Sequence, residues 1–228
     1  MNRFKWLLLA LLVLSCAGCS STKKTNPTVA SLNSSTVDQH AAAKINIQLG
    51  VYYMRRGDIQ RAKQKLTLAL KQDPNYSPAQ SAMGYYLETV GDKQEAQKYY
   101  LRAISLAPKS GAAHNNYGTF LCHNKQYQPA IEQFILATKD RDYLNTAGAY
   151  ENAGLCALKI PDSKLAKKYL NKALRNNPQL PKTLLKLSEI SLSEGDNSAS
   201  QEYLQKFSQL SGPTKQSLKL KKMLNLSS

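Results

Sequence analysis

The stretch GAAHNNYGTFLCHNKQYQPAIEQFILATKD, Gly111 to Asp140, has the pattern of two short helices joined by a polar turn. Both halves place small or apolar residues on one face: Tyr117, Gly118 and Leu121 before the turn HNKQ, and Ala130, Phe134 and Ala137 after it. Small residues at fixed offsets let two helix backbones approach closely, because bulky side chains would hold them apart. The stretch therefore predicts a tightly packed helical hairpin.

The same pattern recurs along the chain. Gly50, Gly84 and Gly118 are 34 residues apart, and Gly154 follows after 36. Alanines repeat at matching offsets, at Ala62, Ala96, Ala130 and Ala166, and again at Ala69, Ala103, Ala137 and Ala173. Glycine inside a helix costs about 1 kcal/mol relative to alanine, so its recurrence indicates that backbones pass closely there. With a weaker fifth copy, the period predicts an all-α repeat domain.

This pattern resembles the tetratricopeptide repeat, a 34-residue helix–turn–helix unit with small residues at its eighth, twentieth and twenty-seventh positions. Pro74, Pro108 and Pro178 match the proline near the end of that unit, where the preceding residue is driven out of the helical conformation. The resemblance implies a right-handed α-solenoid over residues 37–228, with repeats near 43–76, 77–110, 111–144, 147–180 and 181–214 and a capping helix over 214–226.

Two repeats depart from the pattern. The third has Asp142 where proline is expected, and Asn145 and Thr146 are extra, so we expect a longer connection and a local change in the superhelix. The fifth has Ser200 and Phe207 in place of alanines, so we expect looser packing there.

The N-terminus has the features of an export signal. A basic start precedes a nine-residue apolar run, Trp6 to Leu14, which is too short to cross a bilayer as a helix. The sequence therefore predicts a secretory signal peptide over residues 1–18. The segment LSCAGC resembles a bacterial lipobox, with Cys19 as the lipid-bearing residue and Cys16 as the alternative. By the same resemblance, Ser20 points to the outer membrane. Residues 19–36 are polar and bury too little apolar surface to order themselves, so we expect a flexible tether with little regular structure.

The chain is strongly basic, with a formal net charge of +16 that falls by two on removal of the predicted signal. We do not expect an exported protein to bind nucleic acid, so the candidate partners for this charge are anionic headgroups, cell-wall polymers or an acidic protein. The alternative is a generally basic soluble surface.

Nothing in the sequence resembles a catalytic, cofactor or metal site. There is no glycine-rich phosphate loop and no serine nucleophile motif. Cys122 and His123 are adjacent, so on a helix they point about 100° apart and cannot readily share one ion. The sequence thus predicts a protein without enzymatic activity, cofactor or small-molecule substrate.

Cys122 and Cys156 fall at positions twelve and ten of neighbouring first helices. Such helices pack about 8–10 Å apart, and a disulfide requires Cα atoms about 4.4–6.8 Å apart, which is possible where facing sides meet. We expect a bridge in an exported protein; two buried free thiols are the alternative.

By resemblance to the repeat family, the first helices line a partner-binding groove. The residues that this places in the groove are Ile47, Gln48, Val51, Met54, Tyr85, Asn115, Asn116 and Asn152. An asparagine offers both donor and acceptor to a peptide backbone, so Asn116 and Asn152 are candidates to hold an extended segment. The alternative is that both only tie neighbouring helices or loops.

Three stretches resemble the type IV pilus biogenesis lipoproteins of the PilF and PilW family, the pilotins: HNNYGTFLC at 114–122, YENAGLC at 150–156 and LGVYYMRRGD at 49–58. The resemblance implies a lipid-anchored protein on the periplasmic face of the outer membrane. There it would bind the pilus secretin and promote its outer-membrane localisation and multimerisation. An adaptor that recruits peptidoglycan hydrolases or synthases is the alternative.

Overall fold

The computed structural model describes the backbone of residues 29–161 and 163–227, and side chains within 38–161 and 164–225. The chain divides into two compact units, Met1–Thr36 and Val37–Ser228. The predicted signal peptide and both candidate lipidation residues, Cys16 and Cys19, lie outside the described residues.

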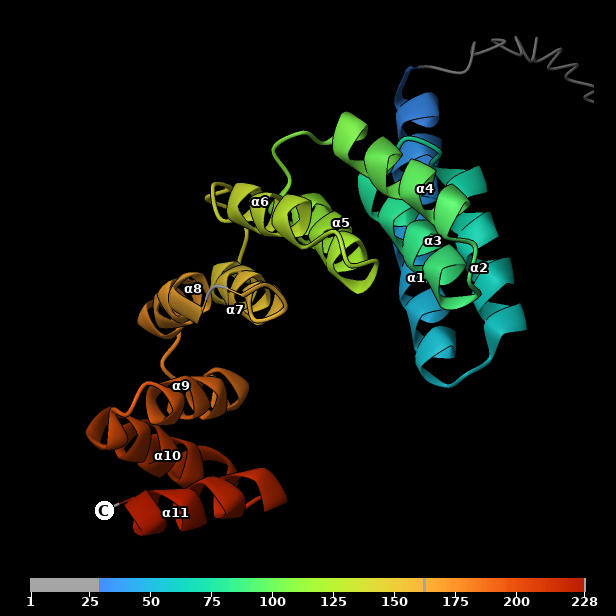
Figure 1. The fold of residues 1–228 in the computed structure, drawn as a ribbon. Coiled ribbons are helices and arrows are strands. Elements are labelled where there is room, and N and C mark those ends of the chain that lie inside the picture. Colours follow the sequence, from blue (N-terminus) through green and yellow to red (C-terminus); the bar gives the residue numbers. More distant parts are fainter. Residues whose placement is uncertain (1–28, 162, 228) are drawn as a thin grey trace, which may run out of the picture. The chain divides into compact units, whose positions relative to one another are not determined.

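The described residues form eleven helices and no strand (Figure 1). They are α1 (Val29–Arg55), α2 (Ile59–Gln72), α3 (Ser77–Thr89), α4 (Lys93–Leu106), α5 (Gly111–His123), α6 (Tyr127–Ala137), α7 (Thr146–Ala157), α8 (Ser163–Asn176), α9 (Pro181–Ser193), α10 (Asn197–Ser211) and α11 (Lys215–Ser227). The predicted helix–turn–helix repeats are therefore confirmed, and α11 packs against α9 and α10.

α1 begins earlier than the sequence suggested. It starts at Val29, so the end of the predicted tether is helical, contrary to the expectation of little regular structure there. Extending an existing helix needs only one further hydrogen bond per residue fixed, whereas starting one is costly. A polar segment joined to the helix of the first repeat can therefore continue it.

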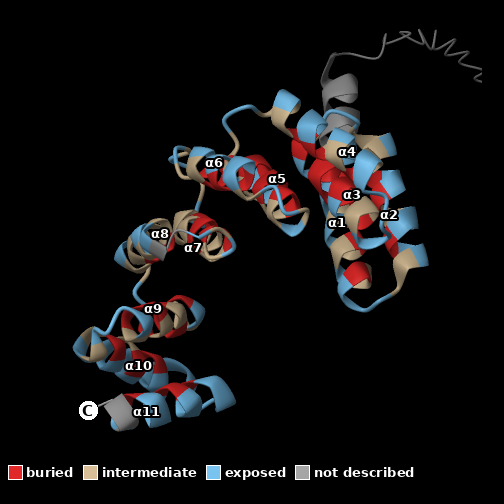
Figure 2. Ribbon diagram, viewed as in Figure 1, coloured by how far each residue is buried: buried red, intermediate tan, exposed pale blue. Residues whose placement is uncertain are grey.

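The recurring glycines lie where the two helices of a repeat approach most closely. A Cβ added to Gly118 would lie 2.9 Å from the ring of Phe134, and one added to Gly154 would lie 2.6 Å from Cγ of Leu170. Figure 2 shows buried residues gathered along the facing sides of paired helices. The close approach inferred from the glycine and alanine pattern is thus present in the structure.

The turns between paired helices use two recurring devices. Asp58 and Asp92 cap the second helices by accepting hydrogen bonds from the backbone N–H groups of Arg61 and Glu95. The residue before each cap is glycine with positive φ in the first, second and fifth repeats. In the third repeat the equivalent residue is Lys125, which adopts φ 64° without the freedom of glycine.

The predicted long connection is confirmed. α6 ends at Ala137 and α7 begins only at Thr146, whereas α4 and α5 are separated by residues 107–110 alone. Asp140 organises this connection by accepting hydrogen bonds from the backbone N–H groups of Gly111, at 2.7 Å, and Asp142, at 3.0 Å. These two bonds lower the pKa of the Asp140 carboxyl below its usual value.

The fifth repeat is not loosely packed, contrary to expectation. Ser200 is fully buried and Phe207 is 4% exposed. Ser188 takes the position of the recurring glycine, and its hydroxyl and that of Ser200 each donate to the backbone carbonyl of the other residue. Hydroxyl groups can replace the glycine–alanine contact because their hydrogen bonds satisfy the buried polar atoms.

A candidate protein-binding groove

A hollow of about 420 Å³ lies between the first helices of the first three repeats. Its lining comes mainly from α1, α3 and α5, with Tyr100 contributed by α4. The lining residues are Ile47, Val51, Ser77, Pro78, Ser81, Ala82, Tyr85, Glu88, Tyr100, Ser110, Ala112, Ala113, Asn116, Thr119 and His123. We refer to this hollow as the groove.

Each helix turns one face to the groove. Ile47 and Val51 of α1 are four residues apart, and Ala82 and Tyr85 of α3 are three apart. On α5 the lining residues follow the same helical spacing: Ala112, Asn116, Thr119 and His123. Side chains three or four residues apart lie on the same side of a helix, so the three helices together present one continuous surface.

The groove presents an apolar surface together with the exposed side-chain amide of Asn116. The Tyr85 ring is 45% exposed, and Ile47 and Val51 are half-buried. Asn116 is exposed, and its side chain has no hydrogen-bond partner among the described residues. Tyrosine gives a large contact area, and the amide can both donate to and accept from a peptide backbone. This surface is suited to binding a protein segment.

One end of the groove is polar. Glu88 accepts a hydrogen bond from the hydroxyl of Tyr100 at 3.0 Å, and its other oxygen lies 2.8 Å from Nδ1 of His123. Burial, together with the charge of Glu88, raises the pKa of Tyr100, so its hydroxyl keeps its proton and acts as a donor. The carboxylate is thereby fixed at the groove end.

The structure brings together half of the residues predicted to line a groove. Ile47, Val51, Tyr85 and Asn116 are among the lining residues, whereas Gln48 is exposed but lies outside the lining.

Met54 does not line the groove, contrary to expectation. It is 7% exposed and packs in a core cluster with Leu66 and Met83. A methionine side chain is long and flexible, so at the edge of a helix face it can turn into the core rather than into solvent.

Asn115 and Asn152 bind each other instead of standing free. The side-chain amide of Asn152 donates to Oδ1 of Asn115 at 3.0 Å, which ties α7 to α5. For Asn152, the structure therefore favours a role in joining neighbouring helices over a role in binding a partner segment.

Two groove residues were absent from the predicted set although the repeat pattern points to them. Glu88 follows Met54 by 34 residues and so takes the same position in its repeat as that predicted groove residue, and His123 stands one position later in the third repeat. Being charged or ionisable, they resembled ordinary surface residues. Only the structure shows that the carboxylate of Glu88 is held between Tyr100 and His123.

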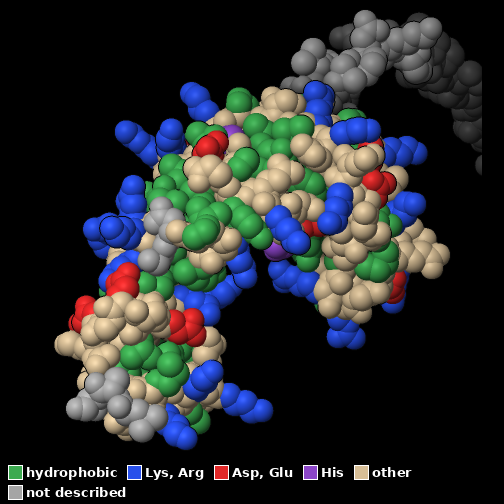
Figure 3. Space-filling view, in the orientation of Figure 1, with side chains coloured by type: hydrophobic (Ala, Val, Ile, Leu, Met, Phe, Trp, Pro, Cys, Tyr) green, Lys and Arg blue, Asp and Glu red, His purple; other side chains and the backbone are tan. Residues whose placement is uncertain are grey.

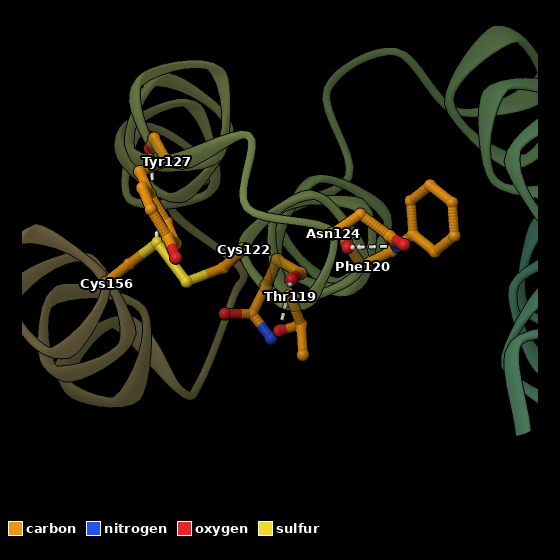
Figure 4. The surroundings of a disulfide bond; sticks show 7 residues. Thr119, Phe120, Cys122, Asn124, Tyr127 and Cys156 are labelled. Atoms are coloured by element: carbon orange, nitrogen blue, oxygen red, sulfur yellow. Dashed lines mark hydrogen bonds between the residues drawn. A yellow bond between two sulfur atoms is a disulfide. The ribbon is translucent and has the colours of Figure 1, made fainter. Parts of the chain in front are cut away.

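A disulfide joins Cys122 at the end of α5 to Cys156 of α7 (Figure 4). The Cα atoms are 6.0 Å apart, within the range that a bridge requires. Cys156 is buried, and its Sγ lies 4.0 Å from the carbonyl oxygen of Tyr127. The bond links the third and fourth repeats directly beside His123, and so fixes one end of the groove.

Basic side chains are prominent on the visible surface of the molecule (Figure 3). Lysine and arginine side chains are spread over the visible face, between patches of apolar side chains (Figure 3). Among the described residues, no three His, Cys, Asp or Glu side chains gather as metal ligands would. In that same part of the chain, no helix combines the length and apolar character needed to cross a membrane.

The tetratricopeptide-repeat family matches this chain over four ranges. These are residues 43–76, 78–110 and 147–180, and, with a second profile of the same description, 99–132. Together they cover more than half of the chain.

Two relatives are similar to this chain over most of their own length. Type IV pilus assembly protein PilF of Pseudomonas aeruginosa is 29% identical over 213 residues, which are 93% of this chain and 82% of PilF. An uncharacterised protein of Haemophilus influenzae is 37% identical over 127 residues, 56% of this chain and 71% of that protein.

Two solved structures of type IV pilus proteins are also similar to this chain. The structure of Pseudomonas aeruginosa PilF has a TM-score of 0.77 and 30% identity, covering 83% of this chain and 85% of that one. The structure of PilW, described as a widely conserved type IV pilus biogenesis factor, has a TM-score of 0.71 and 27% identity, covering 81% and 85%.

Proposed function

This chain belongs to the tetratricopeptide-repeat family and is homologous to PilF, and from that premise we propose that it is a pilotin. In this role it is an outer-membrane lipoprotein that binds the type IV pilus secretin and promotes its localisation and multimerisation. It acts by binding and carries out no catalysis. Homology to PilF and PilW supports the broader role in type IV pilus biogenesis.

The observation that carries the proposal is the similarity to PilF over nearly the whole chain. The alignment with PilF spans 93% of this chain, so it takes in most of the repeats that form the groove. A groove with exposed apolar and amide groups is the part of this chain best suited to hold a segment of another protein.

The proposed mechanism has two parts. Lipid on Cys19 supplies the membrane address, and stable anchoring needs more than one acyl chain, as on a fully acylated lipoprotein cysteine. The groove captures a segment of the secretin, so the trafficking of the lipoprotein carries the secretin with it.

The proposal is tested by deleting the gene and restoring it with defined variants. The deletion should leave secretin monomers and cells without surface pili, and the wild-type gene should restore both. Tyr85→Ala should restore them poorly, because it removes the largest exposed ring of the groove. Tyr52→Ala is the matched control: Tyr52 is 54% exposed but lies outside the groove lining. Normal heat-resistant secretin multimers in the deletion strain would refute the proposal.

Lipidation is tested separately. Metabolic labelling with a palmitate analogue should mark the wild-type protein and the Cys16→Ser variant but not Cys19→Ser. Labelling lost only in Cys16→Ser would show that Cys16, and not Cys19, carries the lipid.

Crosslinking identifies the partner directly. A photoreactive residue at position 116 or 85 should capture the secretin in cells. Capture of peptidoglycan hydrolases or synthases instead would support the alternative adaptor role.

A further inference from the structure

The charge of the groove is opposite to that of the chain. The sequence holds 31 lysine and arginine residues, yet none of them is among the fifteen described residues that line the groove. The single carboxylate in that lining is Glu88. With histidine counted as neutral, as in the formal charge of the chain, the groove lining carries one negative charge on a strongly basic protein.

Glu88 retains capacity to bind a further group. An ionised carboxylate can accept about four hydrogen bonds, and Glu88 accepts only those of Tyr100 and His123 among the described residues. Its side chain is 14% exposed, so water reaches it poorly, whereas His123 is 64% exposed and can move aside. A poorly hydrated carboxylate gains from a cationic partner, because an opposite charge replaces the lost hydration.

Building on the proposed function, we propose that the groove recognises an apolar protein segment carrying a lysine or arginine, whose charged end binds Glu88. Tyr85 and Glu88 are three residues apart on α3, a rise of about 4.5 Å. The apolar and basic groups of the bound segment must therefore lie close together, within one turn of α3. The tyrosine contacts the apolar group, and the carboxylate selects the cation.

The surrounding charge sharpens this selection. A basic segment is repelled by the strongly positive surface that remains after the predicted signal is removed, except near carboxylates. An acidic segment would be attracted by the surface but rejected in the groove. Specificity of this kind rests on an unfavourable contact with the wrong partner as well as a favourable one with the right partner.

Two binding measurements test the chemistry and the partner separately. The first selects phage-displayed random peptides on the purified full chain. The second measures retention of the purified secretin by the same protein. Both compare wild type with Glu88→Gln, which preserves shape and the acceptor for Tyr100, and with Glu132→Gln, which removes the same charge from an exposed position outside the groove. Thermal unfolding of all three proteins checks that the fold is intact.

Selected peptides should contain apolar residues next to lysine or arginine, and should bind Glu88→Gln about tenfold more weakly, as expected for loss of a charged hydrogen bond. Binding to Glu132→Gln should be unchanged. Peptides without a basic residue, or equal binding to wild type and Glu88→Gln, would overturn the proposal. If the peptides are basic but the secretin is not retained, the Glu88 site stands and the proposed function fails. If wild type and Glu88→Gln retain the secretin equally well, the function stands and the Glu88 site is wrong.

Discussion

Ser188 and Ser200 exchange hydrogen bonds across the fifth helical hairpin, each hydroxyl donating to the carbonyl of the other residue at 2.9 and 2.8 Å. Both residues are fully buried. Ser200→Ala removes one donor of this pair, and we expect it to lower the free energy of unfolding by about 1 kcal/mol. Urea denaturation measures the change. An unchanged midpoint would show that the exchange contributes nothing to stability.

A neighbouring serine should respond in the opposite direction. Ser191 is fully buried, and its hydroxyl has no hydrogen-bond partner in the described part of the chain. Ser191→Ala removes an unsatisfied polar group and should raise the free energy of unfolding by about 1 kcal/mol. The same substitution at Ser200 is the matched control, and destabilisation by both would contradict the account.

Lys125 holds a backbone conformation that favours glycine. At φ 64°, a residue with a Cβ costs about 1–2 kcal/mol, while glycine loses about 0.5–1 kcal/mol through the entropy of the unfolded chain. Lys125→Gly should therefore stabilise the protein by about 0.5–1 kcal/mol in denaturant unfolding. Lys109→Gly, in a turn where φ is not positive, should instead destabilise it. Equal effects at both positions would exclude backbone strain as the cause.

Reduction of the disulfide should lower stability substantially. Closing a loop with a sequence separation of 34 residues contributes about 3–4 kcal/mol in the chain-entropy model. Thermal unfolding with and without reductant measures the loss, and the Cys122→Ala/Cys156→Ala double variant should not respond to reductant. Alkylation of either cysteine in native, unreduced protein would show that the bridge is absent.

Asp140 should make the long connection sensitive to acid. Its folded pKa lies below the usual 3.8 because two backbone N–H groups stabilise the carboxylate. The stabilisation is therefore complete above the unfolded pKa and is lost as the pH falls through the lowered folded value. Asp140→Asn should be less stable than wild type at pH 7, and the difference should shrink near pH 3. Asp142→Asn is the matched control, because it changes an exposed neighbouring side chain and keeps the backbone N–H that Asp140 accepts from.

Much of the fold could be predicted because small residues recur in the sequence at a fixed period. Gly118 and Gly154 have no room for a side chain, so their spacing reports packing directly. The tight packing of the fifth repeat could not be predicted because Ser188 and Ser200, which stand where other repeats have glycine and alanine, satisfy each other's hydroxyl groups only in the folded structure. Such compensation depends on the mutual orientation of Ser188 and Ser200, which a period cannot reveal.

The groove was only partly predictable for a related reason. The position of a residue on its helix places Val51 and Tyr85 on the groove side, but it does not determine whether a given side chain points into the groove or into the core. Met54 turned into the core, and Asn152 bound Asn115. Glu88 became notable only through its contacts with residues 12 and 35 positions away in sequence.

The bridge between α5 and α7 also bears on how the repeat array unfolds. Arrays of this kind can open one repeat at a time from their ends, because each repeat contacts only its neighbours. A covalent bond between the third and fourth repeats makes these two a single cooperative block. Fraying from either terminus should therefore stop at this block, leaving the α5 side of the groove as the last part of the binding surface to be lost.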